Sequence, residues 1–305
     1  MKSLLSIMIL FASMCSASLH GRGCGSCCYG DKGNLAVGYT FREDCISYEL
    51  KDFADTSVAQ DFDKLRIHQI TARGYYICDN IYFRGHASGG WIFGGNTTRK
   101  EFIEEIDLAE IYGNADDCNV FDLSGGVGYQ FDCGCSGFKF IPIFGYSWSR
   151  QDIETSHLKL SLDIITNLPL EISIPDLKEC YRLDWYGPWI GIDFLYADYC
   201  GWDLFAGFEY HWADICGNYQ RSSVVFEEVD FTRLSRDEHG CGQGFVGNAG
   251  ILFDLCCNWT GFVMGSYQAW NLNHGCGKDE DGDLLEMRKL DWKSWSVSVG
   301  IACNY

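Results

Sequence analysis

Large apolar residues alternate with small or polar residues over long stretches of the chain. Between residues 292 and 305, for example, Trp295, Val297, Val299 and Ile301 are separated by serine and glycine, and the same alternation runs on to Tyr305. Successive side chains of a β-strand point to opposite faces of its sheet, so this period of two predicts a strand with one apolar face.

The alternation divides the chain into ten predicted strands. They cover residues 34–47, 64–78, 81–94, 119–131, 137–150, 185–199, 202–215, 242–255, 258–272 and 289–305. The connections are alternately short (79–80, 132–137, 200–201 and 256–257) and long (48–63, 95–118, 151–184, 216–241 and 273–288). Short turns at one end and long loops at the other are typical of barrels that span a membrane. We therefore predict an all-β fold, a transmembrane antiparallel up-and-down β-barrel of about ten strands, with both termini on the short-turn, periplasmic side.

The polar face of each predicted strand identifies the lumen. In residues 202–212, Trp202, Phe208 and Trp212 share one face, whereas Glu209 and His211 share the other. Lipid requires the apolar face outside, and a soluble sandwich would rarely place so many charges on one sheet face. The same assignment over all strands predicts a lumen lined by Arg73, Arg84, His86, Asp122, Lys139, Asp193, Glu209 and His211.

Two of the predicted loops contain regular patterns of their own. Residues 102–111 space their apolar side chains as one face of a helix does, so we expect a short helix over the mouth of the barrel. Residues 157–164 and 170–174 alternate on either side of Pro169, which predicts a hairpin that extends the fifth and sixth strands.

The composition agrees with a membrane barrel and restricts its partners. Aromatic residues make up 15% of the chain, which has 35 glycines and four prolines, as expected for a strongly curved sheet with aromatic girdles. The formal net charge of −19 disfavours nucleic acid and anionic lipid as partners and favours cations. Two predicted outer loops carry clustered acidic residues, namely Glu101, Glu104, Glu105, Asp107, Glu110, Glu227, Glu228 and Asp230. A pore with this mouth would prefer cations.

The N-terminus has the composition of a secretory signal peptide. Lys2 precedes a short apolar run that ends in small residues around Ala17 and Ser18, and such segments are removed on export. We predict a signal peptide at residues 1–18, a cysteine- and glycine-rich periplasmic arm at 19–33 and the barrel at 34–305. No later stretch approaches the roughly 20 apolar residues of a membrane helix, so strands must carry the membrane insertion.

The chain has 17 cysteines, and removing Cys15 with the signal peptide leaves 16. An even number in an exported protein favours disulfide bonds. No cysteine and histidine set has zinc-finger spacing, so we predict no metal and no cofactor. Either all cysteines pair within the chain, or the outer ones join loops while some inner ones bond to other proteins. The disulfide candidates are Cys24, Cys27, Cys28, Cys45, Cys118, Cys133, Cys135, Cys180, Cys216, Cys241, Cys256, Cys257 and Cys276.

These features together resemble the cysteine-rich outer-membrane porin family of the chlamydia group, in particular its amoeba-associated relatives. The resemblance rests on the signal peptide, the cysteines at the barrel rim, glycine–aromatic strands such as residues 189–194 (Trp-Ile-Gly-Ile-Asp-Phe), and Tyr305. It implies a location in the bacterial outer membrane, a pore for small solutes, and disulfide cross-links to other cysteine-rich envelope proteins.

The strand count and loop lengths also look like those of the omptins, which are outer-membrane proteases. Residues 90–91 (Gly-Trp) and 248–250 (Asn-Ala-Gly) are similar in place to that family's. Omptins place an Asp-x-Asp pair beyond the third strand and an Asp-x-His pair beyond the seventh, where a carboxylate and an imidazole activate water. Here the first stretch offers Glu105 and Asp107, and the second, residues 214–220, has no histidine. His239 has an aspartate two residues before it but follows about twenty residues later. We expect the architecture without the catalysis.

A ten-stranded barrel leaves only a narrow lumen, because eight strands are just filled by side chains. We therefore expect a porin-like, structural component of the envelope that contacts outer-membrane lipid and contains a small, cation-preferring pore for small solutes. There are two alternatives. The first is an omptin-like endopeptidase that would use Glu105, Asp107 and His239, and the second is a binding barrel or adhesin that acts through its acidic outer loops.

Overall fold

The computed structural model describes residues 32–52, 56–103, 106–116, 118–133, 137–162, 170–174, 177–197, 201–226, 229–231, 234–256, 258–280 and 282–305. These residues form strands joined by turns, and no helix among them is long and apolar enough to cross a membrane. The predicted signal peptide and N-terminal arm lie outside this part of the chain, except for Lys32 and Gly33 in the first strand.

Ten long strands contain most of the described residues. They are β1 (Lys32–Asp52), β2 (Thr56–Cys78), β3 (Ile81–Ile103), β5 (Cys118–Tyr129), β7 (Phe138–Leu162), β9 (Glu179–Ala197), β10 (Trp202–Arg221), β13 (Leu234–Cys256), β14 (Trp259–Asp279) and β15 (Leu284–Asn304). Three shorter strands belong to the same sheet, namely β4 (Ile106–Ala115), β6 (Phe131–Asp132) and β8 (Leu170–Ile174). A separate hairpin consists of β11 (Val224–Phe226) and β12 (Val229–Phe231).

The ten long strands close into an antiparallel ring. Each pairs with the next long strand in the chain, and β1 pairs with β15 along its length, from Asn34 opposite Asn304 to Asp52 opposite Leu285. The predicted all-β antiparallel barrel is confirmed. Its sheet has thirteen strands rather than about ten, because β4, β6 and β8 are separate segments that pair with β3 or β7 at the ends of the ring.

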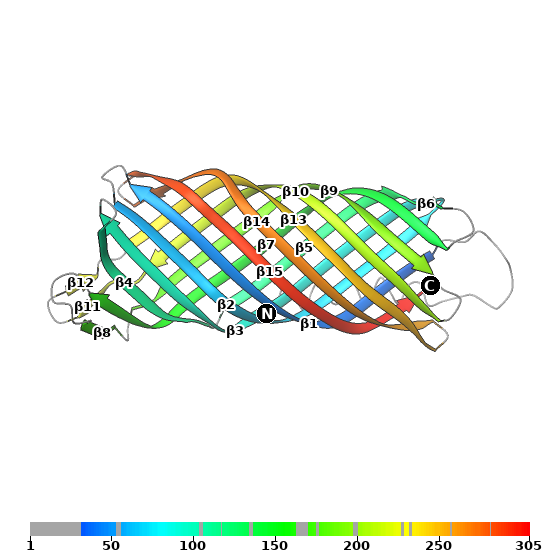
Figure 1. The fold of residues 1–305 in the computed structure, drawn as a ribbon, viewed down its shortest axis with the longest axis horizontal. Helices are drawn as coiled ribbons and strands as arrows, with labels where there is room; N and C mark the ends of the chain where they lie inside the picture. The colour runs from blue at the N-terminus through cyan, green and yellow to red at the C-terminus, as the bar shows by residue number, and fades with distance from the viewer. Residues whose placement is uncertain are drawn as a thin grey trace.

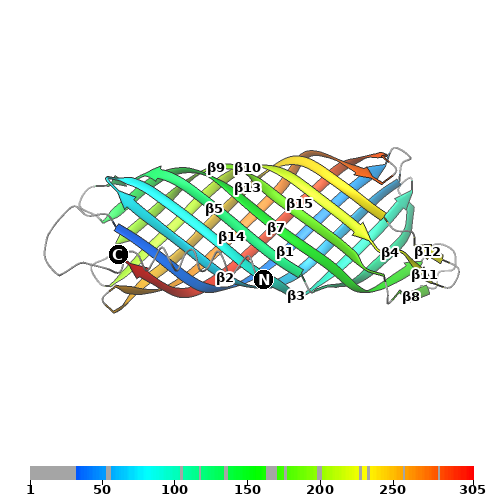
Figure 2. The same cartoon turned by 180° about the vertical axis from the view of Figure 1, so that it is seen from behind.

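The two ends of the elongated barrel differ (Figures 1 and 2). Tyr305, which exchanges backbone hydrogen bonds with Gly33, lies at one end together with β6, on the right in Figure 1. The tight turn Asp79–Asn80 joins β2 to β3 at this end, which we call the short-turn end. The strands β4, β8, β11 and β12 lie at the opposite end, which we call the long-loop end.

At the long-loop end the strands extend well beyond the predicted ones. Much of the predicted loops, including residues 56–63, 216–221 and 234–241, continues the neighbouring strands. The predicted helix at 102–111 is wrong, because Ile103 ends β3 and pairs with Ile106 at the start of β4. The predicted hairpin at 157–174 is confirmed, since Leu158 of β7 pairs with Ile174 of β8.

The outer face of the barrel is apolar only over the part nearest the short-turn end. Trp202, Phe208 and Trp212 of β10 face outward and are 47–50% exposed, whereas Asp214 and Gln220 occupy the outer face farther along. About 9–11 residues of a tilted strand cross a bilayer, which matches the interval from Trp202 to Trp212. We call this zone the apolar band. Exposed aromatic residues border it on both sides, namely Trp202, Trp259 and Tyr305 toward the short-turn end and Trp91, Trp212 and Trp295 toward the long-loop end.

The interior of the barrel changes from polar to apolar at the height where the apolar band ends. Glu209 and His211 point inward from the part of β10 inside the apolar band, and Ile215 and Tyr219, each 1% exposed, point inward beyond it. The largest apolar cluster of the barrel fills this second part. Polar and apolar side chains therefore keep alternating beyond the apolar band, but there the apolar side chains point inward and the polar ones outward. Burial of this apolar inner face explains why the segments predicted as loops are strands.

Candidate functional site

Charged side chains from three strands meet inside the apolar band near the short-turn end. Arg84 of β3 donates to Asp193 of β9 at 2.7 Å and to Glu209 of β10 at 2.5 Å. Tyr82 donates to the other oxygen of Asp193 at 3.1 Å, and the Arg84 guanidinium lies 4.8 Å from the centre of the Trp189 ring. Since β3 and β10 lie on opposite walls of the ring, this cluster crosses the interior.

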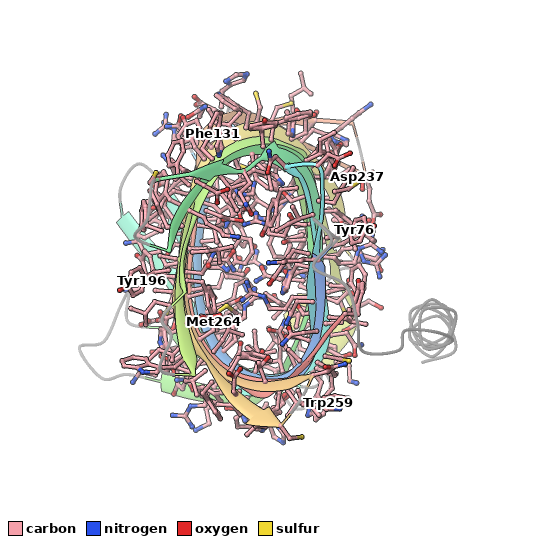
Figure 3. All side chains as sticks on the ribbon, turned by 90° about the vertical axis from the view of Figure 1, so that its right-hand side faces the viewer. Tyr76, Phe131, Tyr196, Asp237, Trp259 and Met264 are labelled. Atoms are coloured by element: carbon pink, nitrogen blue, oxygen red, sulfur yellow. The ribbon has the colours of Figure 1, made fainter. Side chains whose placement is uncertain are left out.

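Arg73 crosses the same level from β2. Its guanidinium contacts the sulfur of Met264 in β14 and lies 4.7 Å from the centre of the Phe205 ring in β10. Figure 3 looks along the barrel and shows Met264 inside the ring, with Phe131, Tyr196 and Trp259 outside it. A cavity of about 40 Å³ remains among these side chains, so the lumen is nearly filled here.

A polar chamber of about 150 Å³ follows toward the long-loop end. Hydroxyl groups line much of it: Thr40 shares hydrogen bonds with Thr71 at 2.8 Å and with Ser298 at 2.7 Å. Ser147 is 3.1 Å from Nδ1 of His211, whose Nε2 is 2.9 Å from Glu209. A cavity of this size with polar walls is suited to ordered water, which needs several hydrogen-bond partners.

A buried carboxylate network bounds the chamber on its far side. Asp44 accepts hydrogen bonds from Arg42 at 2.5 and 2.7 Å, from Gln151 of β7 at 2.5 Å and from the indole N–H of Trp292 at 3.1 Å. Asp122 of β5 accepts a third bond from Arg42 at 2.8 Å. The network thus joins strands β1, β5, β7 and β15 across the lumen.

Three tryptophans form a layer next to this network. Trp185 of β9, Trp270 of β14 and Trp292 of β15 are at most 5% exposed, and their ring centres are 5.5–6.1 Å apart. A Cβ atom on Gly244 would lie 2.4 Å from the Trp270 ring, so only glycine lets that ring pack against β13. We call these three residues the tryptophan layer. β14 and β15 are neighbours and β9 is three strands from β14 around the ring, so the three rings cover part of the lumen with apolar surface.

Further toward the long-loop end the walls touch directly. Tyr48 of β1 and Tyr181 of β9 stack with their ring centres 5.0 Å apart, although β1 and β9 are five strands apart around the ring. Phe62 of β2 stacks on the same Tyr181 ring at 6.1 Å. The described side chains therefore cross the lumen at several successive levels.

Two buried ion pairs stand within this outer core. Arg99 pairs with Glu179 at 3.0 Å, and Arg236 pairs with Glu238 at 2.6 Å. The hydroxyl of Tyr181 donates to the second oxygen of Glu238 at 2.8 Å. Each charge is neutralised inside an apolar environment, where an unpaired ion would be costly.

Seven of the eight lumen residues expected from the sequence line the two cavities. These are Arg73, Arg84, His86, Asp122, Asp193, Glu209 and His211. The eighth, Lys139, lies near the short-turn end with its ammonium 3.5 Å from the side chain of Gln130. Of these charges, Arg84 pairs with Asp193 and Glu209 across the interior, and Asp122 pairs with Arg42.

Sequence reasoning missed several of the residues that cross the lumen. Arg42 and Asp44 could have been found, because they continue the polar face of Thr40 in the predicted strand 34–47. Trp185 and Trp292 gave no such signal, since aromatic residues at strand ends were assigned to the lipid-facing girdles. Both instead point inward beyond the apolar band.

The residues of the protease alternative lie as follows. His239 points outward from β13, with its Nδ1 atom 3.4 Å from the sulfur of Cys216 on β10, whereas its neighbour Glu238 points inward. Glu105 and the side chain of Asp107 lie outside the described part of the chain. The described atoms thus bring His239 next to a thiol rather than a carboxylate.

The described cysteines lie in strands or next to them. They are Cys45, Cys78, Cys118, Cys133, Cys180, Cys216, Cys241, Cys256, Cys276 and Cys303, and no disulfide joins any two of them. The remaining disulfide candidates, Cys24, Cys27, Cys28, Cys135 and Cys257, lie outside the described residues. The predicted disulfides therefore stay a prediction.

Comparison with known protein families identifies one that covers the whole barrel. A family model described as "Pom: Protochlamydia outer membrane protein" matches residues 34–305. No curated protein sequence matches the chain.

Solved structures of bacterial outer-membrane barrels share the fold. The outer membrane protease OmpT from Escherichia coli is similar with a TM-score of 0.68 and 12% sequence identity, over 90% of this chain and 97% of that one. The outer membrane protein OprG from Pseudomonas aeruginosa has a TM-score of 0.35 and 10% identity, over 90% and 96% of the two chains. Only the similarity to OmpT supports a conclusion, and that conclusion is limited to the barrel fold.

Proposed function

The chain belongs to the family of Protochlamydia outer membrane proteins, and we propose that it is a structural component of the outer membrane whose lumen is closed to solutes. A densely packed interior helps a barrel to stay folded in lipid, and pairing avoids the large cost of leaving a buried charge without a partner. The narrow pore expected from the sequence would require an interior without such crossings.

The tryptophan layer is the observation that carries this proposal. It belongs to the outer apolar core and borders the polar chamber, so a solute that leaves the chamber on this side would have to displace buried rings. Interior side chains in van der Waals contact leave no path for water, and removing a large buried side chain typically costs several kcal/mol. The charged cluster around Arg84 forms a second barrier toward the short-turn end.

A small, cation-preferring pore is the second candidate. The polar chamber favours it, because its hydroxyl and carboxylate groups could replace water around a passing cation. Two of the acidic residues expected at the mouth, Glu101 and Glu110, have cationic partners, with Arg99 2.7 Å from Glu101 and Lys100 3.8 Å from Glu110. Conduction in this candidate requires an open state in which the tryptophan layer has moved.

Electrical recording separates the two candidates. We expect the oxidised, refolded full chain to give no discrete conductance steps in a planar bilayer, because side chains cross the lumen at several levels. Heat-modifiable gel mobility of the same protein recovered from lipid vesicles checks that the barrel is folded and inserted. Reproducible cation-selective steps from the folded protein would overturn the closed-barrel proposal and establish the pore.

Cross-linking to other envelope proteins completes the proposed function. Cys256 is exposed at the short-turn end, where the inner cysteines were expected, so a partner thiol could reach it. Other cysteine-rich envelope proteins are the proposed partners. In native envelopes, we expect this chain to migrate in high-mass species on non-reducing gels and as a monomer after reduction. Identical mobility under both conditions would contradict cross-linking and leave the closed barrel itself untouched.

A further inference from the structure

Two cysteines on the outer wall of the barrel, beyond the apolar band, each contact a histidine of a neighbouring strand. Cys216 of β10 is directly opposite His239 of β13, and Cys241 of β13 is directly opposite His274 of β14. The sulfur of Cys216 is 3.4 Å from Nδ1 of His239. The sulfur of Cys241 is 2.9 Å from Nε2 of His274. We call these contacts the two thiol–imidazole pairs.

All four side chains of these pairs point away from the core. The two cysteines are partly exposed and the two histidines are exposed, whereas their sequence neighbours Ile215 and Glu238 are buried. Cys216 lies four residues past Trp212 on β10, on the side of the long-loop end where the outer wall faces water. A dissolved reagent can therefore reach both sulfur atoms.

The contact between a sulfur and an imidazole nitrogen is an arrangement that activates a thiol. The thiolate rather than the thiol is the attacking species, and a base within hydrogen-bonding reach assists its formation. With the ring proton on its other nitrogen, each imidazole can accept the thiol proton through the nitrogen that faces the sulfur. At Cys216 the hydroxyl of Tyr186, which is 3.4 Å from the sulfur, can donate a hydrogen bond to the resulting thiolate.

The two cysteines are poorly placed to bond to each other. Cys241 is opposite Asp214, two residues before Cys216, so the cysteines are diagonal neighbours on adjacent strands. Such positions are about 7–8 Å apart, whereas a disulfide usually joins Cα atoms about 4.4–6.8 Å apart. No disulfide joins any two cysteines of the described residues. Both thiols therefore stay available to a reagent from solution.

We propose that Cys216 and Cys241 are modification sites that undergo thiol–disulfide exchange with disulfides of low molecular mass at the outer surface of the barrel. The imidazole takes the thiol proton, and the thiolate attacks one sulfur of the small disulfide. A new S–S bond to the cysteine forms while the old S–S bond breaks. The departing thiolate leaves with the bonding electron pair and takes the proton from the imidazolium.

The small disulfide is the oxidant in this exchange. The cysteine is oxidised to a mixed disulfide and the small disulfide is reduced to a thiol, so no further reactant is needed. The exchange does not depend on whether the lumen is closed, because it takes place on the outer wall.

Neither pair has a signature in the sequence. The partners are 23 residues apart in one pair and 33 residues apart in the other, and the antiparallel register of β10, β13 and β14 brings them together. Counting cysteines in the sequence therefore treated Cys216 and Cys241 as ordinary disulfide candidates.

Cys180 of β9 provides an internal control. Its side chain is exposed, but the residues opposite it are Glu154 of β7 and Gln220 of β10 rather than a histidine. Partial desolvation of the sulfur and the nearby carboxylate of Glu154 raise the pKa of the Cys180 thiol. We therefore expect Cys180 to react slowly with disulfides, although it is more exposed than Cys216 and Cys241.

Rates of mixed-disulfide formation at individual cysteines test the proposal. The full chain is folded in detergent micelles, fully reduced, freed of reductant under anaerobic conditions and mixed with oxidised glutathione. Samples are quenched with acid, free thiols are alkylated, and mass spectrometry of peptides gives the fraction of each cysteine that carries glutathione. Cys216 and Cys241 should react at least about tenfold faster than Cys180, a small part of the roughly 10²–10⁴-fold that a positioned base contributes. Equal or slower reaction than at Cys180 would overturn the proposal.

Two histidine variants serve as controls for each other. His239→Gln should slow the reaction of Cys216 at least about tenfold and leave that of Cys241 within about twofold, and His274→Gln should do the reverse, because each removes one base. Heat-modifiable gel mobility shows whether each variant is folded, and if one is not, the comparison with Cys180 in the parent protein decides. Loss of reactivity at both cysteines in each folded variant, or at neither, would contradict the assigned role of the imidazoles.

Discussion

Glu238→Ala should lower the free energy of unfolding of the barrel by about 3–5 kcal/mol, the cost of removing one partner of a buried ion pair. Glu238 is 0% exposed and Arg236 is 5% exposed, and their side chains are 2.6 Å apart within the outer apolar core. Without the carboxylate, the guanidinium of Arg236 would stay buried beside Tyr48 and Tyr219 with no ion partner. Urea titration of the protein in lipid vesicles, followed by tryptophan fluorescence, measures the change.

Three further variants separate charge from packing in this experiment. Glu238→Gln should cost less than Glu238→Ala, because the amide can still accept the hydrogen bond from Tyr181. The double variant R236M/E238L should recover most of the loss, since apolar replacement of both ions of a buried pair is often neutral or stabilising. Asp237→Ala, one residue earlier on the outer face, should change stability by at most about 0.5 kcal/mol. A loss below about 1 kcal/mol for Glu238→Ala would mean that water reaches this pair.

Phe208→Arg should destabilise the barrel in a bilayer by about 2–4 kcal/mol, as charged residues do on the lipid-facing surface at the bilayer midplane. Phe208 lies on β10 midway between Trp202 and Trp212 and is 50% exposed on the apolar band. The same substitution at Gln220, also outward on β10 but beyond the band, should cost at most about 0.5 kcal/mol, because that position faces water. Unfolding titrations of both variants in vesicles of the same lipid provide the comparison.

The difference between these two positions locates the membrane boundary. The cost of Phe208→Arg should depend on bilayer thickness, whereas the small effect at Gln220 should be the same in all lipids tested. Equal losses at the two positions would show that the membrane extends along the whole strand and would contradict the change of polarity at Trp212.

The barrel itself could be predicted from local pattern because lipid imposes a strict rule. Side chains such as Phe208 and Glu209 must point to opposite solvents within the apolar band, so a period of two appears directly in the sequence. The short connections predicted at 79–80 and 256–257 then divide this pattern into strands. Strand identity and direction followed from these signals without tertiary information.

The outer half of the barrel could not be predicted in the same way. Ile215 and Tyr219 point inward there, although the apolar face of the same strand points outward a few residues earlier. A prediction that assumes the same apolar face along the whole strand therefore ends the strand at the point where the apolar side chains change from the outer face to the inner face. The helix predicted at residues 102–111 is wrong for a related reason. Short apolar runs fit a helix or a buried strand equally well, and here the pairing of β3 with β4 decides between the two.

Some members of the candidate site were predicted from the sequence, but their arrangement was not. Strand parity placed Arg84, Asp193 and Glu209 on the polar face, but their contacts join strands that are far apart in the ring. The alternation of inward and outward side chains is a local property of each strand, whereas closure of the lumen depends on side-chain length and on the diameter of the ring.

The exchange of polar and apolar faces along each strand also sets how the barrel stands in its membrane. From Trp212 to Arg221, β10 continues for nine residues (221 minus 212) past the apolar band, or about 30 Å along the strand. With a strand tilt of about 35–45° this is a height of about 20–25 Å above the bilayer. Sliding the barrel inward would bring Asp214 into lipid, and sliding it outward would expose Phe208 to water, so its depth is fixed. The half of the barrel beyond the apolar band is therefore rigid and holds the long-loop end at a constant height and orientation above the bilayer, where large molecules can reach it.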